Sequence, residues 1–265
     1  MFVECEQRLK PIAPPIHIDN PLIERLNMFV TLGAEERDAV AALTRSRRSI
    51  KANETLVREG SSPDRVFLIL SGAAFRYRFL ENGRRQIIGY LLPGDLCDTK
   101  FLIDNDADHS VGALCDIEVA TIVPALLMAT MVEYPKIERA LLMMSLVDAA
   151  IMREWLINVG QRDAFQKLAH FFCEMNARYR ALQSADTDEI YSMPLTQVDL
   201  ADTMGLTVVH VNRVLQRFRR EGLLSWSRRH VEIPDPSMLE SIAGFNDRYL
   251  RLPRVPAQSM GAMFC

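Results

Sequence analysis

The sequence predicts an α+β fold, in which an antiparallel β-roll is followed by one long helix and a helix-turn-helix with a wing. Glycines recur at positions 60, 72, 83 and 94 between short apolar runs, at the spacing of a strand plus a turn. Apolar residues after Pro135 alternate at four and three positions, which is a helical period. Six arginines and a single acid lie between Thr207 and His230. We divide the chain into an N-terminal arm (1–20), a β-roll domain (21–134), a long helix (135–161), a winged helix-turn-helix domain (162–250) and a C-terminal tail (251–265).

The first segments are expected to be an extended arm and two short helices. Prolines at 11, 14, 15 and 21 remove backbone donors and restrict their neighbours, so the first 20 residues do not favour a folded element. Residues 21–46 then show apolar positions at helical spacing, with an interruption around Gly33.

Short strands are expected from Ser49 to Val123, arranged as an antiparallel meander or roll. One hairpin is legible, because three aromatic residues alternate with two arginines before the turn at 81–83, namely Phe75, Arg76, Tyr77, Arg78 and Phe79. The alternation predicts that the rings face the core and the arginines face solvent.

A long helix is expected from Pro135 to about Gly160. One stripe runs along it, which we call the first stripe: Ile137, Leu141, Met144, Asp148, Ile151 and Trp155. Such spacing over nearly three heptads predicts a partner helix, most simply the same helix of a second subunit. The alternative is that the stripe packs on the chain's own β-roll. Asp148 would be costly if buried unpaired, so it is expected to fix register or to meet a basic partner.

The charge distribution favours a nucleic-acid partner. The chain carries a net charge of −3, yet the segment from Thr207 to His230 carries +5, so the remainder carries −8. A basic patch on an acidic body is typical of a protein that meets phosphate with one surface.

Other classes of protein fit the sequence less well. The most apolar stretch, Ala140 to Met152, contains Asp148 and is shorter than the roughly 20 residues that span a bilayer. The first residues lack a secretory signal, so we expect a cytoplasmic protein with no membrane contact. The five cysteines are scattered without a CxxC pair, which argues against disulfides, a zinc site or an iron–sulfur cluster. No metal ligands are predicted.

The run LTQVDLADTMGLTVVHVNRVLQRFRREGLL has the parts of a helix-turn-helix in order. Thr196 can cap a first helix through Met204, Gly205 permits the turn, and Thr207 can cap the second helix. In that second helix four apolar positions are expected to face inward: Val211, Val214, Leu215 and Phe218. Downstream, LLSWSRRHVEIPD predicts two short strands around an arginine-tipped wing.

The remaining positions of this region are expected to contact double-stranded DNA. Arg213 is the main candidate for base readout, because arginine can contact guanine O6 and N7 together. His210, Asn212 and Val209 are further candidates, and Asn212 can meet either a base edge or a phosphate. Backbone contacts are expected from Gln197, Thr207, Gln216, Arg217, Arg220, Arg228 and Arg229.

With these motifs the chain resembles the CRP/FNR family of bacterial transcription regulators, from about Pro21 to Pro234. The strongest match is LADTMGLTVVHVNRVLQRFRREGLL, and weaker matches are VREGSSPDRVFLILSGAAFRYR, YLLPGDL and RDAFQKLAHFF. The resemblance implies a cupin-like, cyclic-nucleotide-binding-type β-roll that acts as a sensor. It also implies dimerisation through the long helix, a C-terminal DNA-binding domain and RNA polymerase as a further partner.

The sequence departs from the members that bind cAMP. Those members carry a phosphate cassette resembling Gly-Glu followed by Arg-Ser, because a cyclic phosphate needs a cation and the ribose hydroxyl an acceptor. Here Asp98, Thr99 and Lys100 stand where the Gly-Glu would fall, and His109 precedes Ser110 where the arginine would stand. Met152 and Arg153 replace the helix hydroxyls. We therefore expect no cAMP binding. A weak effector pocket for another anion remains an alternative, and its lining would be Asp98, Thr99, Lys100, His109, Ser110 and Arg153.

Two further departures bear on cofactor and target. The oxygen-sensing branch of the family needs clustered N-terminal thiolates, and only Cys5 lies there, so no cofactor is expected. Val209 stands where many members have a glutamate, so the usual half-site is not expected. A rival interpretation is a ligand-responsive β-roll that acts through protein contacts, with a vestigial helix-turn-helix. An enzyme is disfavoured, because the sequence shows no nucleophile–base motif, metal spacing or phosphate loop.

Overall fold

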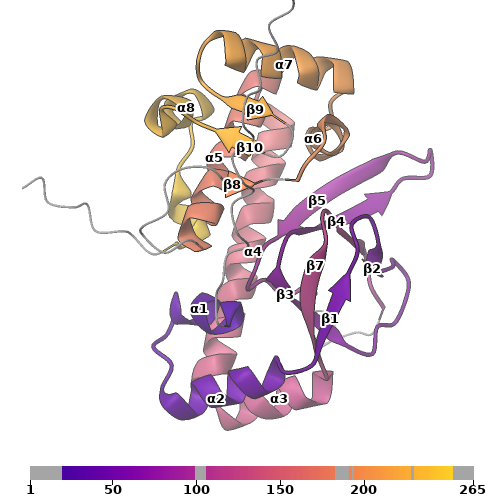
Figure 1. Cartoon of the computed structure of the whole chain (residues 1–265), viewed down its shortest axis with the longest axis vertical. Coiled ribbons are helices and arrows are strands. Elements are labelled where there is room, and N and C mark those ends of the chain that lie inside the picture. Colours follow the sequence, from indigo (N-terminus) through magenta and orange to yellow (C-terminus); the bar gives the residue numbers. More distant parts are fainter. Residues whose placement is uncertain (1–19, 99–105, 183–190, 193, 228–229, 253–265) are drawn as a thin grey trace, which may run out of the picture.

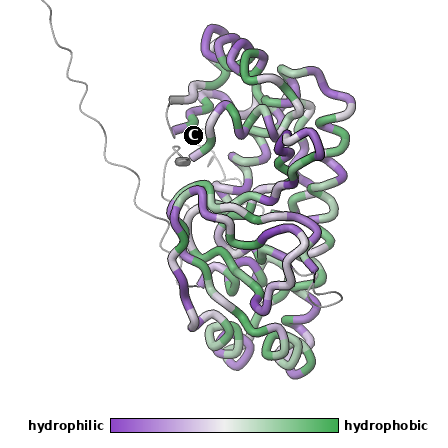
Figure 2. The backbone as a smooth tube through the Cα atoms, turned by 90° about the vertical axis from the view of Figure 1, so that its right-hand side faces the viewer, coloured by the Kyte–Doolittle hydropathy of each residue, from purple (hydrophilic) through white to green (hydrophobic). Residues whose placement is uncertain are grey.

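The computed structural model describes residues 20–98, 106–182, 191–192, 194–227 and 230–252. Residues 1–19 of the expected arm (1–20) and residues 253–265 of the expected tail (251–265) lie outside the described residues. A long helix runs through the molecule, with the β-roll beside it and a small helical domain at one end (Figure 1). Hydrophilic and hydrophobic residues alternate along the helices, as expected of amphipathic elements (Figure 2).

Among the described residues before position 124, two short helices and seven strands are present, which confirms the predicted helices and roll. The helices are α1 (Pro21–Asn27) and α2 (Ala34–Leu43). The strands are β1 (Arg47–Ile50), β2 (Thr55–Val57), β3 (Val66–Ser71), β4 (Ala74–Phe79), β5 (Arg85–Leu91), β6 (Ser110–Ala113) and β7 (Ile117–Ile122). They form two antiparallel sheets, ordered β1-β7-β3 and β2-β6-β4-β5. All four periodic glycines have positive φ, from 75° to 92°, which is why the turns require them.

The β4–β5 hairpin forms as predicted, but its two faces are not divided into core and solvent. Phe75, Tyr77 and Phe79 share one face, with neighbouring ring centroids 5.1 and 5.6 Å apart, yet Phe79 is 60% exposed near the tip. The face of β4 that carries the arginines is turned to the interior of the roll, because Ala74, on the same face, belongs to the roll core. Arg76 therefore points inward, where its side chain is only 19% exposed.

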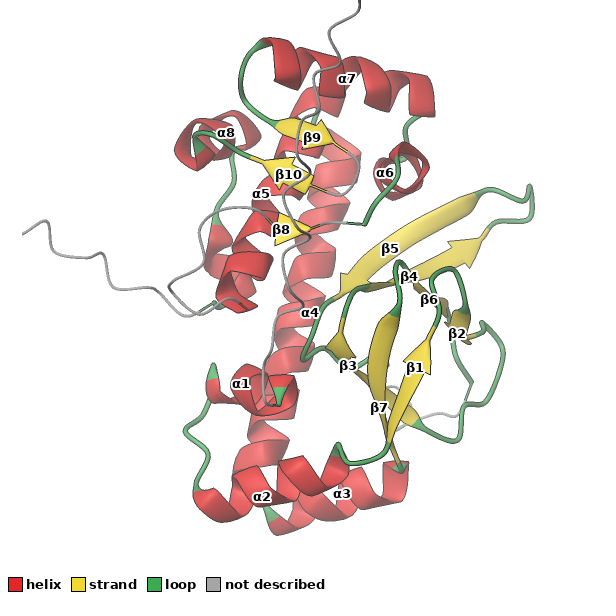
Figure 3. Cartoon of the chain, viewed as in Figure 1, coloured by secondary structure: helices red, strands yellow, loops and turns green. Residues whose placement is uncertain are grey.

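Helix α4 (Pro135–Gln161) occupies the predicted range of the long helix and begins, as expected, at Pro135. The preceding helix α3 (Pro124–Glu133) was not predicted, because its exposed side is also apolar and masks the helical period. Helix α5 (Ala164–Leu182) follows α4 after a short connection (Figure 3).

The interpretation of the first stripe as an intersubunit seam is wrong. The alternative, packing on the chain's own β-roll, holds in part, because helices α1, α3 and α5 also cover the stripe. Its five apolar members, Ile137, Leu141, Met144, Ile151 and Trp155, are 1–9% exposed within the single chain. Asp148 meets a basic partner of the same chain, since its Oδ2 lies 3.3 Å from Nη2 of Arg76. The stripe thus seats α4 on the roll and on the C-terminal domain.

A buried carboxylate joins α4 to the C-terminal domain. Glu174 of α5 is fully buried and accepts hydrogen bonds from Nε1 of Trp155, at 3.0 and 3.1 Å, and from the hydroxyl of Tyr249, at 2.7 Å. Burial raises the pKa of Glu174, while Arg178 and these donors oppose the rise.

The C-terminal domain contains a helix-turn-helix and a three-stranded sheet. Its elements after α5 are β8 (Tyr191–Ser192), α6 (Gln197–Met204), α7 (Val208–Arg220), β9 (Ser225–Ser227), β10 (His230–Glu232), α8 (Pro236–Ala243) and the 3-10 helix η2 (Asp247–Leu250). The sheet order is β8-β10-β9, so β9 and β10 form the predicted wing. β8, α8 and η2 were not predicted, because such short elements carry little periodicity of their own.

Candidate nucleic-acid interface

The turn between α6 and α7 is built by the residues that the sequence indicated. The Thr196 side chain accepts a hydrogen bond from Asp199 N, and the Asp199 carboxylate accepts one from Thr196 N, which together form a capping box. Gly205 ends α6 in the left-handed region at φ 65°. The hydroxyl of Thr207 then accepts from His210 N at 3.2 Å and begins α7.

Helix α7 has one buried face and one free face. The four positions expected inside are buried, and Val211 and Phe218 are fully so. Phe218 stacks on Phe165 of α5 at 4.5 Å between ring centroids, which anchors α7 to the rest of the domain. The opposite face points away from the β-roll at the end of the molecule (Figure 1). This free face contains every residue of α7 that was predicted to contact DNA.

The candidates for base readout lie together on this free face. Arg213 is exposed, and its guanidinium has no hydrogen bond to any residue that the structure describes. Val209 is 70% exposed, and His210 is exposed beside it. Asn212 donates from Nδ2 to Oε1 of Gln197 at 3.2 Å. A residue predicted to read a base is thus held by a residue predicted to contact the DNA backbone.

The candidates for backbone contact differ in how far their own chain occupies them. Nε of Arg217 donates to Glu221 at 2.8 Å, and its guanidinium lies 3.8 Å from the Phe165 ring centroid. Arg220 is 75% exposed, 3.9 Å from the same glutamate. The hydroxyl of Thr207 is already engaged as the cap of α7, whereas Gln216 is exposed. Arg228 and Arg229, which the sequence analysis predicted to contact the DNA backbone, lie outside the described residues.

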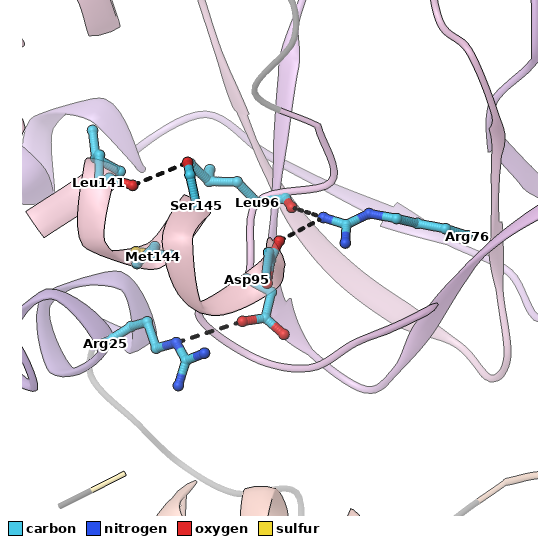
Figure 4. A pocket seen from close by; sticks show the side chains of 8 residues that line it. Arg25, Arg76, Asp95, Leu96, Leu141, Met144 and Ser145 are labelled. Carbon is cyan, nitrogen blue, oxygen red and sulfur yellow. Dashed lines mark hydrogen bonds and ion pairs between the residues drawn. The ribbon is translucent and has the colours of Figure 1, made fainter. Parts of the chain in front are cut away.

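A second site, between the β-roll and α4, is filled by side chains of the chain itself. Arg76 donates from Nε to Cys97 O at 3.1 Å and from Nη2 to Leu96 O at 3.0 Å, and it pairs with Asp148 on α4 (Figure 4). Arg25 enters from α1 and lies 3.6 Å from Asp95. The cavity left between these groups is about 20 Å³, which is room for about one water molecule.

The predicted effector residues are not brought together around this cavity. Asp98, Asp108 and His109 place ligand-type atoms within 4.8 Å of one another, but His109 Nδ1 already meets Asp108 Oδ1 at 2.6 Å. The Ser110 hydroxyl accepts from Glu59 N at 3.0 Å. Arg153 does not belong to this pocket, because it lies on the exposed side of α4. Thr99 and Lys100 lie outside the described residues.

Arg76 was missed as a site residue, although one signal pointed to it. An acid in the apolar stripe of α4 indicated a basic partner, and Arg76 is one of two arginines on β4, the first strand of the hairpin. The sequence could not choose between Arg76 and Arg78, whose guanidinium instead binds Glu59 at 2.6 Å.

Comparisons with known proteins agree with this geometry. The model of a Crp-like helix-turn-helix domain matches residues 166–242, and that of a cyclic nucleotide-binding domain matches residues 47–133. A "probable transcriptional activator" of Rhizobium leguminosarum bv. viciae is 28% identical over 214 residues, 80% of this chain and 88% of the relative. The "transcriptional activator protein FnrL" of Cereibacter sphaeroides is 28% identical over 200 residues, 74% of this chain and 80% of the relative.

Solved structures share the fold. FixK2 from Bradyrhizobium japonicum superposes with a TM-score of 0.66 at 22% identity, covering 74% of this chain and 96% of that one. A CooA mutant from Carboxydothermus hydrogenoformans gives 0.60 at 19% identity, covering 85% and 97%. With both domain models in this order, one long helix between them and an exposed face on α7, the chain belongs to the CRP/FNR family of transcription regulators.

Proposed function

We propose that this regulator acts as a homodimer on a pseudo-palindromic DNA site, and that it reads each half-site chiefly through Arg213. The observation that supports it most is the free face of α7, where an unengaged guanidinium stands between exposed Val209, His210 and Gln216. In a symmetric dimer the two recognition helices would enter successive major grooves about 34 Å apart. The proposal includes RNA polymerase as a further partner and the bacterial cytoplasm as the location.

A second stripe on α4 supports the homodimer. It consists of Leu142, Leu146, Ala149, Arg153, Leu156 and Gly160, which again alternate at four and three positions. Leu142, Leu146 and Leu156 are 59%, 55% and 75% exposed, so this side of the helix is apolar and uncovered by the chain's own domains. Arg153 can lay its aliphatic stem along such a seam while its charged end reaches solvent. We assign the dimer interface to this second stripe.

Selection of bound sequences from random duplex DNA, followed by mobility-shift titration, tests the function. We expect one pseudo-palindrome to bind at least about 10³-fold more tightly than unrelated DNA. The rival function, signalling through protein contacts with a vestigial helix-turn-helix, predicts only weak binding that falls steeply with salt and has no preferred sequence.

We further propose that cAMP is not the effector. A cyclic phosphate needs a cation, but the imidazole of His109 already meets Asp108 Oδ1 through its Nδ1 at 2.6 Å. Met152 and Arg153, at the positions where cAMP binders offer hydroxyls, are exposed. We expect isothermal titration calorimetry with cAMP to show no saturable heat at micromolar concentrations. Saturable binding in that range would contradict the proposal.

No iron–sulfur cluster is proposed for this chain. Cys97 lies in the roll core and Cys173 in the core around α5, so these two thiols belong to different parts of the fold. Burial raises the pKa of Cys97 to about 12, which keeps the thiol protonated, whereas the thiolate is the metal-binding form. The proposed role is regulatory, and no cofactor is proposed for it.

A further inference from the structure

A cluster of charged side chains ties the β-roll to the first helix of the helix-turn-helix. The guanidinium of Arg85, on β5, donates from Nη2 to Asp199 Oδ1 at 2.6 Å and from Nε to Asp202 Oδ2 at 2.7 Å. All three side chains are at most 24% exposed. Charge-assisted hydrogen bonds of this length, partly screened from water, are stronger than a surface ion pair.

The same two elements meet through further contacts. The hydroxyls of Tyr90 and Thr203 lie 2.7 Å apart in a buried position, and Gln86 donates from Nε2 to Thr203 O at 3.2 Å. Tyr90 also packs against Trp155 and Phe171, with ring centroids 6.0 and 5.5 Å away. β5, α4, α5 and α6 thus share one apolar core below the charged cluster.

The position of α6 gives these contacts their meaning. Asp199 both caps α6 and binds Arg85, so the contact holds the helix where it begins. Helix α7 packs on α6 through the turn at Gly205, and its free face points away from β5. Arg85 therefore supports α7 indirectly, through α6, and leaves the free face of α7 uncovered.

We propose that Arg85 is a positioning residue for DNA recognition, which fixes the orientation of α6 and α7 relative to α4. The inference rests on the proposed function, since orientation matters only when two recognition helices bind one duplex. A rigid pair loses less conformational freedom on binding than a loose pair, and it accepts one half-site spacing. A loosened pair keeps the contacts of each α7 but loses the advantage of the correct spacing.

The test compares Arg85→Ala with Arg84→Ala, its exposed neighbour on the same hairpin. Affinities are measured for the selected pseudo-palindrome, for versions with the spacer changed by one or two base pairs, and for a duplex with one intact half-site. For Arg85→Ala we expect about a 10-fold loss on the preferred spacing, because charge-assisted hydrogen bonds are lost, and a reduced penalty for altered spacers. Half-site binding should stay within about twofold of the wild type, and Arg84→Ala should behave as the wild type.

Asp202→Asn provides a second variant, because it removes one ionic partner of Arg85 without touching the cap that Asp199 forms. Asp202→Asn should show a smaller loss of affinity for the preferred spacing and a smaller change in spacer preference, at an unchanged melting temperature. Wild-type spacing preference in both variants would overturn the proposal, as would an equal loss on half-site and full-site DNA. If the wild-type protein bound no DNA sequence-specifically, the proposed function would fail first, and the role of Arg85 with it.

Discussion

Arg213→Ala is expected to lower affinity for the specific site by about 1–3 kcal/mol per half-site and to relax the preference at one base pair in each. The reason is that Arg213 is exposed on the reading face of α7 and that no described residue of the chain engages its guanidinium. Fluorescence anisotropy with duplexes changed at one position at a time measures both effects.

Arg220→Ala is the matched control, because it removes the same charge from the same helix at a position that is 75% exposed. It should weaken all sequences alike and reduce the salt dependence by about one phosphate contact. Unchanged sequence discrimination in Arg213→Ala would show that another residue reads the base.

Leu146→Glu is expected to dissociate the proposed dimer. The substitution places a carboxylate in the second stripe of each α4, and an unpaired buried charge costs about 3–5 kcal/mol. The dimer dissociation constant should rise by at least roughly 10²-fold, and binding to the full pseudo-palindrome should fall to the level of a single half-site. Analytical ultracentrifugation and DNA titration at the same protein concentration check the two results.

Leu80→Glu is a closely matched control for that experiment. Leu80 is 53% exposed and Leu146 is 55% exposed, but Leu80 lies at the tip of the β4–β5 hairpin, away from α4. The same chemical change there should leave the dimer intact. Dissociation by both variants, or by neither, would argue against the second stripe as the interface.

The helix-turn-helix could be predicted from sequence because its signals are local. Thr196, Gly205 and Thr207 each act on backbone groups within a few residues, so their roles do not depend on the rest of the fold. The inward and outward faces of α7 follow from helical periodicity alone. What the sequence could not show is that Asn212 and Gln197 hold each other, since that contact joins two helices.

The choice of dimer interface failed for a different physical reason. Helix α4 carries two stripes with the same four-three spacing, one starting at Ile137 and the other at Leu142. Both satisfy the rule for a helical seam. Which stripe the chain covers with its own domains depends on tertiary packing, and the sequence of the helix does not contain that information. The cluster around Arg85 was missed for a related reason, because Arg85 lies more than 110 positions from both of its acidic partners.

The ion pair between Arg76 and Asp148 has a mechanical consequence. It fastens β4 to the middle of α4, while Arg85 fastens the neighbouring strand β5 to α6. One hairpin is therefore linked both to the long helix and to the helix-turn-helix, so a displacement of the hairpin would be transmitted to both.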